Sequence, residues 1–303
     1  MANATGDVPL RTFFSCSSDP KGLLIYILSS VNVLIAITSF PGNLLIIVVL
    51  RRITSIHPPS KLLYSSLACT DLCVGIILQP LSIVFLLSLE VSDLCSHIGS
   101  TFSAVALALC GVSLLTSTAI SFDRFFAMKL GIRYRHYITK ELIWAFVFIS
   151  WLVSCGNAVL YIYESDVFAY TTTAAVFLCV LTSVFSYVKI YRALRYHQTQ
   201  VQQRLHLQQP NRRVIPINIA RYRKTVSSAL WVSAVLVACY LPFVVIIFTA
   251  YSSGIHSPVL ALAADLAITL VQLNSSLNPL LYCWKIKEVR RTAINSLKQF
   301  LCC

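Results

Sequence analysis

Seven long apolar stretches dominate this sequence and restrict the chain to membrane folds. Each reaches the roughly 20 residues that a helix needs to cross a hydrocarbon core about 30 Å thick. Strands of a membrane β-barrel would instead alternate apolar and polar residues in short segments, and these stretches do not. We therefore expect an all-α membrane protein, a seven-transmembrane helix bundle. The expected spans are residues 23–50, 62–89, 95–122, 142–163, 167–188, 225–251 and 258–284.

The composition excludes an ordinary soluble domain. Apolar residues make up 57% of the chain and charged residues only 12%, whereas about 25% of a typical soluble domain is charged. Residues 1–22 contain no short apolar core followed by a cleavage site, so we expect no signal peptide. The first span would then direct insertion into the membrane.

Basic residues are distributed unevenly over the connections between the spans. All of the 24 Lys and Arg residues except Arg11 and Lys21 fall on one side of the predicted bundle. The positive-inside rule therefore predicts an extracellular N-terminus and a cytoplasmic C-terminus. Because the net charge of +13 follows this topology, it does not indicate nucleic-acid binding. The acids of the outer side form either a solvated rim or an attractive surface for a cationic ligand: Asp7, Asp19, Glu90, Asp93, Glu164, Asp166 and Asp265.

The chain divides into an outer tail at 1–22, a membrane domain at 23–284 and a cytoplasmic end at 285–303. Residues 196–221 are rich in Gln and Arg and read as a helix extension that runs into a linker. Residues 285–301 have an amphipathic pattern that is typical of a helix lying on the inner membrane surface. Cys302 and Cys303 follow it and are either palmitoylation sites or unmodified thiols. In the outer tail, Asn3 begins a glycosylation sequon.

One acid lies deep within the second span. A lone acid near the membrane centre costs about 2.5 kcal/mol or more, so Asp71 should face the bundle and find polar partners there. Such a group could hold water or a small cation such as sodium, or it could be a structural polar cluster. The candidate partners are Asn43, Ser113, Asn274 and Asn278.

Short motifs lie in order along the spans. They are Gly42-Asn43, Leu67-Ala68-Cys69-Thr70-Asp71, Asp123-Arg124-Phe125, Trp151, Tyr187, Cys239-Tyr240-Leu241-Pro242 and Asn278-Pro279-Leu280-Leu281-Tyr282. With these motifs the chain resembles the rhodopsin-like (class A) G-protein-coupled receptors along essentially its whole length. Two positions depart from the usual pattern, since the family usually has Tyr where Phe125 stands and Trp where Tyr240 stands.

The resemblance implies a receptor, not an enzyme, that converts binding of an extracellular ligand into activation of a heterotrimeric G protein. It implies that Asp123 holds Arg124 in the inactive state, and that Tyr187 and Tyr282 reach toward Arg124 in the open state. Pro242 and Pro279 would act as hinges because they remove backbone hydrogen bonds. Tyr240 would pass occupancy of the ligand pocket to the hinge. The cluster of Asp71, Asn43, Ser113, Asn274 and Asn278 would bind sodium when closed.

Several family features are missing from this sequence. The usual disulfide from the third span is absent, because Gly99 stands at its place and the second outer loop has no cysteine. Cys95 lies about one turn away, with Cys16 as its only obvious outer partner; two free thiols are the alternative. Span five has Cys179 where the family usually has proline, which resembles the melanocortin, lipid and adenosine-related group. The lower end of span six has no acid that could pair with Arg124, only Tyr222, Arg223 and Lys224.

The resemblance also narrows the ligand. Gln272 stands where a visual pigment has its retinal-binding lysine, so no retinal cofactor is expected, and Ala106 stands where amine receptors have an acid. The expected pocket wall is largely apolar, which favours a neutral or lipid-like ligand over a small peptide. It consists of Ala106, Cys110, Thr171, Tyr240, Phe243, Val244, Ile247, Ile268 and Gln272.

The sequence also bears on alternatives to a signalling receptor and on a metal site. A seven-helix receptor that no longer signals remains open, and a transporter is disfavoured because the sequence shows no inverted repeat. Cys95-Ser96-His97 has no further His or Cys at ligand spacing, so we expect no zinc-like site there. Beside the G protein and the ligand, membrane lipids are the expected partners.

Overall fold

The computed structural model describes residues 22–90, 92–163, 165–207, 231, 234–250 and 258–301. These residues are nearly all helical, and none of them forms a strand. Six helical segments are long and apolar enough to cross a membrane, and a seventh, shorter apolar helix is Ala234–Ala250. The predicted all-α membrane bundle is confirmed.

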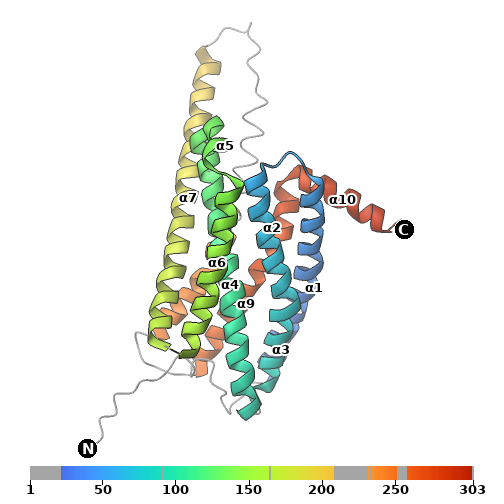
Figure 1. Ribbon diagram of the computed structural model, residues 1–303, viewed down its shortest axis with the longest axis vertical. Coiled ribbons are helices and arrows are strands. Elements are labelled where there is room, and N and C mark those ends of the chain that lie inside the picture. Colours follow the sequence, from blue (N-terminus) through green and yellow to red (C-terminus); the bar gives the residue numbers. More distant parts are fainter. Residues whose placement is uncertain are drawn as a thin grey trace, which may run out of the picture.

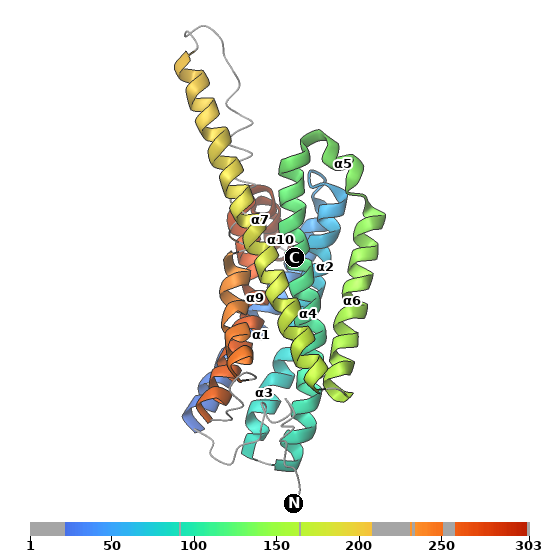
Figure 2. The same ribbon diagram turned by 90° about the vertical axis from the view of Figure 1, so that its left-hand side faces the viewer.

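The long helices run roughly parallel to the long axis of the molecule (Figure 1). The central helix α4 lies between α6 on one side and α1 with α9 on the other (Figure 2). The elements of the bundle in chain order are α1 (Gly22–Arg52), α2 (Pro58–Cys73), η2 (Val74–Leu78), α3 (Gln79–Leu87), α4 (Ser92–Leu130), α5 (Tyr134–Tyr137), α6 (Lys140–Tyr163), α7 (Ser165–Leu207), the helix Ala234–Ala250 and α9 (Pro258–Lys285).

The helices extend past the apolar stretches that predicted them. α4 continues to Leu130, and α7 continues to Leu207, because hydrogen bonding along a helix does not stop where the hydrocarbon region ends. The extension of α7 agrees with the helix expected from residue 196 onward. The rest of that connection, residues 208–221, lies outside the described residues.

The second span contains a local change of helical type. The segment η2 (Val74–Leu78) is π-helical, directly before Pro80 in α3. A proline cannot donate a backbone hydrogen bond, and a wider turn before it accommodates the missing donor. Gly75 lets this turn approach α1 closely, since an added Cβ would lie 3.1 Å from the Phe40 backbone nitrogen.

α1 and α9 also approach each other closely. A Cβ on Gly42 would lie 3.1 Å from Cγ of Pro279, so any larger side chain there would push the two helices apart. Toward the end of the bundle where α10 lies, an apolar core is shared by α1, α2, α4, α9 and α10. It is built around Ile46, Val49, Leu63, Leu67, Ile120, Tyr282 and Val289.

The expected amphipathic helix after the last span is α10 (Lys287–Leu301). It turns away from the bundle at the end where α5 lies (Figure 1). Val289 and Ala293 are buried against the core, whereas Ile294 and Leu297 are each 46% exposed. Arg52 of α1 fixes the helix by donating from Nη1 to the Gln299 Oε1 at 2.7 Å. The exposed apolar side chains suit the predicted position on the inner membrane surface.

Candidate functional site

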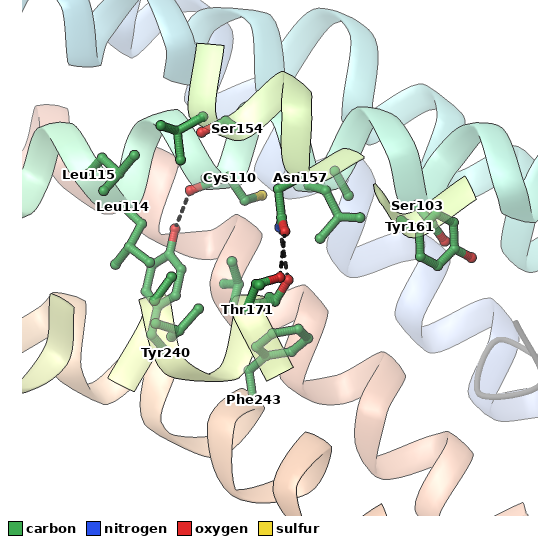
Figure 3. Close-up of a pocket in the computed structure, with 18 of the residues that line it drawn as sticks. Ser103, Cys110, Leu114, Leu115, Ser154, Asn157, Tyr161, Thr171, Tyr240 and Phe243 are labelled. Atoms are coloured by element: carbon green, nitrogen blue, oxygen red, sulfur yellow. Dashed lines mark hydrogen bonds between the residues drawn. The ribbon is translucent and has the colours of Figure 1, made fainter. Parts of the chain in front are cut away.

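A cavity of about 670 Å³ lies among α4, α6, α7, α9 and the helix Ala234–Ala250 (Figure 3). This volume lies inside the range of about 300–1,000 Å³ that is usual for small-molecule sites. The described residues that line it include no Asp, Glu, Lys or Arg. Ser103, Ser154, Asn157, Thr171, Thr172 and Tyr240 supply neutral polar groups within an otherwise apolar wall.

Seven of the expected pocket residues line this cavity: Ala106, Cys110, Thr171, Tyr240, Phe243, Ile247 and Ile268. Val244 and Gln272 lie outside its lining. Val244 packs against the neighbouring apolar cluster around Leu236. Gln272 is fully buried, and its Oε1 accepts a hydrogen bond at 3.2 Å from Nε2 of Gln79 on α3.

The structure adds a wall that the sequence did not indicate. Val153, Ser154, Gly156, Asn157, Leu160 and Tyr161 of α6 all line the cavity. Asn157 Nδ2 donates to Thr172 Oγ1 at 2.8 Å, and Thr171 Oγ1 donates to Asn157 Oδ1 at 3.3 Å (Figure 3). These bonds tie α6 to α7 inside the cavity. An Asn in the middle of an apolar span was the signal that could have found this wall.

Tyr240 lines the cavity two residues before Pro242 of the same helix. The Tyr240 side chain is 3% exposed and lines the cavity. Its hydroxyl donates to the backbone oxygen of Cys110 at 3.1 Å (Figure 3). Since Pro242 follows two residues later, a ligand that displaces this ring would move the segment where the helix is weakest.

The carboxylate of Asp71 is fully buried within the bundle. Ser113 Oγ donates to its Oδ1 at 3.0 Å, and Asn278 Nδ2 donates to its Oδ2 at 2.7 Å. No Lys, Arg or His forms an ion pair with it among the described residues. The carboxylate thus links the second, third and seventh spans through hydrogen bonds. No described Lys, Arg or His neutralises it.

Two other predicted members of this cluster do not contact the Asp71 carboxylate. The Asn43 amide donates to the backbone oxygens of Ser39 at 2.9 Å and Ser275 at 3.0 Å, and so links α1 to α9. Its Oδ1 is buried without a hydrogen-bond partner in the part of the chain that is described, and so is Nδ2 of Asn274. Ser39 Oγ, which accepts from the Asn43 amide at 3.3 Å, itself donates to the backbone oxygen of Asp71 at 2.9 Å, so this orphaned oxygen belongs to the polar cluster around Asp71.

Asp123 holds Arg124 at the opposite end of the bundle from the cavity. Arg124 Nε donates to Asp123 Oδ2 at 3.0 Å, and its Nη2 also bonds this oxygen. Ser60 Oγ donates to the same oxygen at 2.9 Å, and Tyr134 of α5 donates to Oδ1. Burial, together with the adjacent Asp123, raises the pKa of the Tyr134 phenol, so it remains a neutral donor. The guanidinium also lies over the ring of Tyr64, 5.8 Å from its centroid.

A sequence comparison then settles which family these features represent. The sequence pattern described as "7 transmembrane receptor (rhodopsin family)" matches residues 42–182 and 163–282. The chain belongs to this family of receptors.

Similar receptors cover most of the chain. The adenosine receptor A3 of Ovis aries is 27% identical over 297 residues, which is 90% of this chain and 90% of that receptor. The trace amine-associated receptor 1 of Homo sapiens is 25% identical over 291 residues, or 84% of this chain and 82% of that receptor. This protein is therefore a multi-pass G-protein-coupled receptor of the plasma membrane, and not an enzyme.

The two tyrosines predicted to reach toward Arg124 in the open state each pack on another tyrosine ring. Tyr187 is 36% exposed and its ring stacks on Tyr191 of the same helix, with centroids 6.5 Å apart. Tyr282 is buried and packs edge-on against Tyr64, with centroids 5.1 Å apart. Both positions agree with a closed arrangement in which Asp123 retains Arg124.

An aromatic contact joins the sixth and seventh spans of the receptor near the Arg124 end. The rings of Trp231 and Trp284 have centroids 5.4 Å apart and are tilted by 58°. Sequence reasoning did not single out this pair. The prediction that no acid at the lower end of span six pairs with Arg124 concerns Tyr222, Arg223 and Lys224, which lie outside the described residues.

Cys95 is buried and disulfide-bonded in the receptor. Its partner lies outside the described residues, as do Cys16, Asn3, Cys302 and Cys303. The other described cysteines are free: Cys69, Cys73, Cys110, Cys155, Cys179, Cys239 and Cys283. The alternative in which Cys95 stays a free thiol is therefore wrong, while its pairing with Cys16 stays a prediction.

Proposed function

We propose that the receptor binds an uncharged small molecule or lipid-like ligand in the cavity beside Tyr240. The observation that supports this most is the lining, which contains no charged side chain among the described residues. A charged ligand would lose its hydration there without gaining a counter-ion, at a cost of several kcal/mol. A cationic amine, the kind of ligand that the name of the trace amine-associated receptor suggests, is disfavoured as the ligand of this cavity for this reason.

The same proposal assigns the route from the ligand to the G protein. Ligand contact would shift Tyr240 and bend its helix at Pro242, with Pro279 as the second hinge. The cytoplasmic end of that helix would then move outward and Arg124 would leave Asp123 to engage the G protein. In this open state Tyr187 and Tyr282 would turn toward Arg124. The N-terminus is proposed to be extracellular and the C-terminus cytoplasmic.

Sodium is the proposed allosteric ion of the closed state. Asp71 would supply the charge, and Ser113 with the unpartnered Oδ1 of Asn43 would supply neutral oxygens. Asn274 and Asn278 would orient this group through their amides. The described residues include no group of three His, Cys, Asp or Glu, which disfavours a transition metal.

Modifications and lipid contacts complete the proposal. Cys16 would pair with Cys95, Asn3 would be glycosylated, and Cys302 and Cys303 would be palmitoylated to hold α10 at the membrane lipids.

A pooled ligand screen tests the proposed ligand class. Cells that express the receptor with a promiscuous G protein would be exposed to neutral lipids, neutral metabolites including adenosine, trace amines and peptides, with calcium as the readout. We expect responses to neutral compounds, and we expect Ala106→Trp, which fills the cavity, to abolish them. A response confined to amines or peptides, or one unaffected by Ala106→Trp, would contradict the proposal.

A further inference from the structure

Among the described residues, part of the cavity lining on α6 and α7 is also exposed. Four residues that line it are also exposed: Val153, Gly156, Thr171 and Ala175. Val153 alone is 55% exposed. Residues that belong both to an internal cavity and to the outer surface mark the place where the cavity reaches that surface.

This opening lies at a depth where the surroundings are lipid. Gly156 stands about 10 Å along α6 from its end at Tyr163, and Ala175 about 15 Å along α7 from its start at Ser165, at 1.5 Å per residue. The hydrocarbon core is about 30 Å thick, so both residues lie within it. The side chains around the opening are exposed and apolar, as acyl chains require: Leu152, Val159, Phe177 and Leu178.

Two glycines show which side of the cavity is open. A Cβ added to Gly111 of α4 would lie 2.8 Å from Oγ of Ser154, so α4 and α6 are in close contact there. A Cβ added to Gly156 would meet no heavy atom within 4 Å. The space beside Gly156 is therefore open, and Gly156 of α6 and Ala175 of α7 both line the cavity without a long side chain that could fill it.

Neutral polar groups lie inside this opening. The Asn157 amide donates one hydrogen to Thr172 and retains a second N–H for another acceptor. Ser103 also lines the cavity and is 3% exposed. Its Oγ has no hydrogen-bond partner among the described residues. These groups can bind a hydroxyl, ester or amide, but the described lining has no cation for a carboxylate or phosphate.

We propose that the cavity opens sideways into the bilayer between α6 and α7 and takes a neutral single-chain lipid that enters from the membrane. Its hydroxyl, ester or amide head group binds Asn157, Thr172 and Ser103, and its chain occupies the apolar part of the cavity. This inference rests on the proposed function, in that the cavity is taken as the ligand site. It adds the class of lipid and the route of entry.

Photolabelling of the full chain in phosphatidylcholine nanodiscs tests the inference. The probe is a monoacylglycerol with a diazirine in its acyl chain, and its fatty-acid analogue serves as the charged comparison. The readout is the rate and final extent of label on residues 106–115 of α4 that unlabelled monoacylglycerol displaces. We expect displaceable label from the neutral probe and at least tenfold less from the fatty acid.

Plug variants test the route of entry. Gly156→Trp should slow the labelling at least tenfold, while Phe148→Trp, exposed on the same helix about two turns away and outside the cavity lining, should leave the rate unchanged. If Gly156→Trp does not give a monodisperse receptor, Ala175→Trp with Leu181→Trp as its control gives the same comparison from α7, because Leu181 is exposed and outside the cavity lining. Wild-type labelling rates in a folded plug variant would overturn the sideways entry and leave the proposed function standing. Absence of displaceable label in the wild type would overturn the lipid class, and the pooled screen would then decide the proposed function separately.

Discussion

The Trp231–Trp284 contact should hold the receptor closed, and Trp284→Ala should therefore raise its basal activity. The contact joins the end of the sixth span to α9, with ring centroids 5.4 Å apart. Outward movement of the sixth span, as the proposed activation requires, would separate these rings. A contact that exists only in the closed state stabilises that state by its full interaction energy.

The size of the effect follows from the geometry of the pair. A tilted aromatic pair contributes about 0.5–1.5 kcal/mol beyond area burial. Trp231 is 45% exposed and Trp284 is 56% exposed, so the lower part of this range applies, about 0.5–1 kcal/mol. Losing it would raise the ratio of open to closed receptor by about two- to fivefold. Because the open state is the minor one, basal activity should rise by the same factor.

Nucleotide exchange on a G protein without ligand measures this change. Trp284→Phe keeps a ring and should give a smaller rise, and Trp144→Ala, 60% exposed on α6, should give none. The double variant Trp231→Ala/Trp284→Ala should resemble either single one, because both remove the same contact. Basal exchange that is unchanged or lower in Trp284→Ala, at normal surface expression, would refute the reasoning.

Three further predictions concern the ion, the disulfide and the packing of α4. Agonist affinity should fall with rising sodium, and Asp71→Asn should remove that dependence; a wild type insensitive to sodium would make the cluster structural. Non-reducing peptide mapping should recover Cys16 linked to Cys95, a closure that allows up to about 4 kcal/mol of stabilisation, whereas separately alkylated peptides would disprove it. Gly111→Ala should lower the free energy of unfolding of the receptor by about 1–3 kcal/mol, because its Cβ would lie 2.8 Å from Ser154 Oγ. Gly156→Ala, where an added Cβ meets no heavy atom within 4 Å, is the control, and an equal loss of stability in that variant would contradict this explanation.

The bundle itself could be predicted from the sequence because the length of an apolar stretch is a direct physical requirement for crossing a bilayer. The partners of Asp71 could be predicted only in part. Ser113 and Asn278 contact its carboxylate, but the Asn43 amide bonds the Ser275 backbone oxygen instead. Which of several nearby oxygens an amide selects depends on helix rotations of a few degrees, and composition does not encode them.

The ligand cavity shows the same limit. The walls from spans three, five, six and seven could be expected from the resemblance, whereas the wall from α6 could not. Asn157 reads in the sequence as one polar residue in an apolar span, and only the packing of α6 against α7 shows that it faces Thr172. Gln272 does not line the cavity, and only the structure shows that its side chain instead accepts a hydrogen bond from Gln79 on another span.

Nucleotide exchange by the wild type and by Arg124→Ala tests the central claim most directly. Asp123 alone among the described acids forms an ion pair with Arg124, and it keeps its hydrogen bonds from Ser60 and Tyr134 when the guanidinium is removed. Arg124→Ala should therefore remove the G-protein contact, and a monodisperse variant shows that the fold is retained. With purified receptor in nanodiscs and a purified heterotrimeric G protein, we expect exchange above the receptor-free rate for the wild type. We expect none for Arg124→Ala at the same concentration of folded receptor. Undiminished exchange by Arg124→Ala would contradict the account.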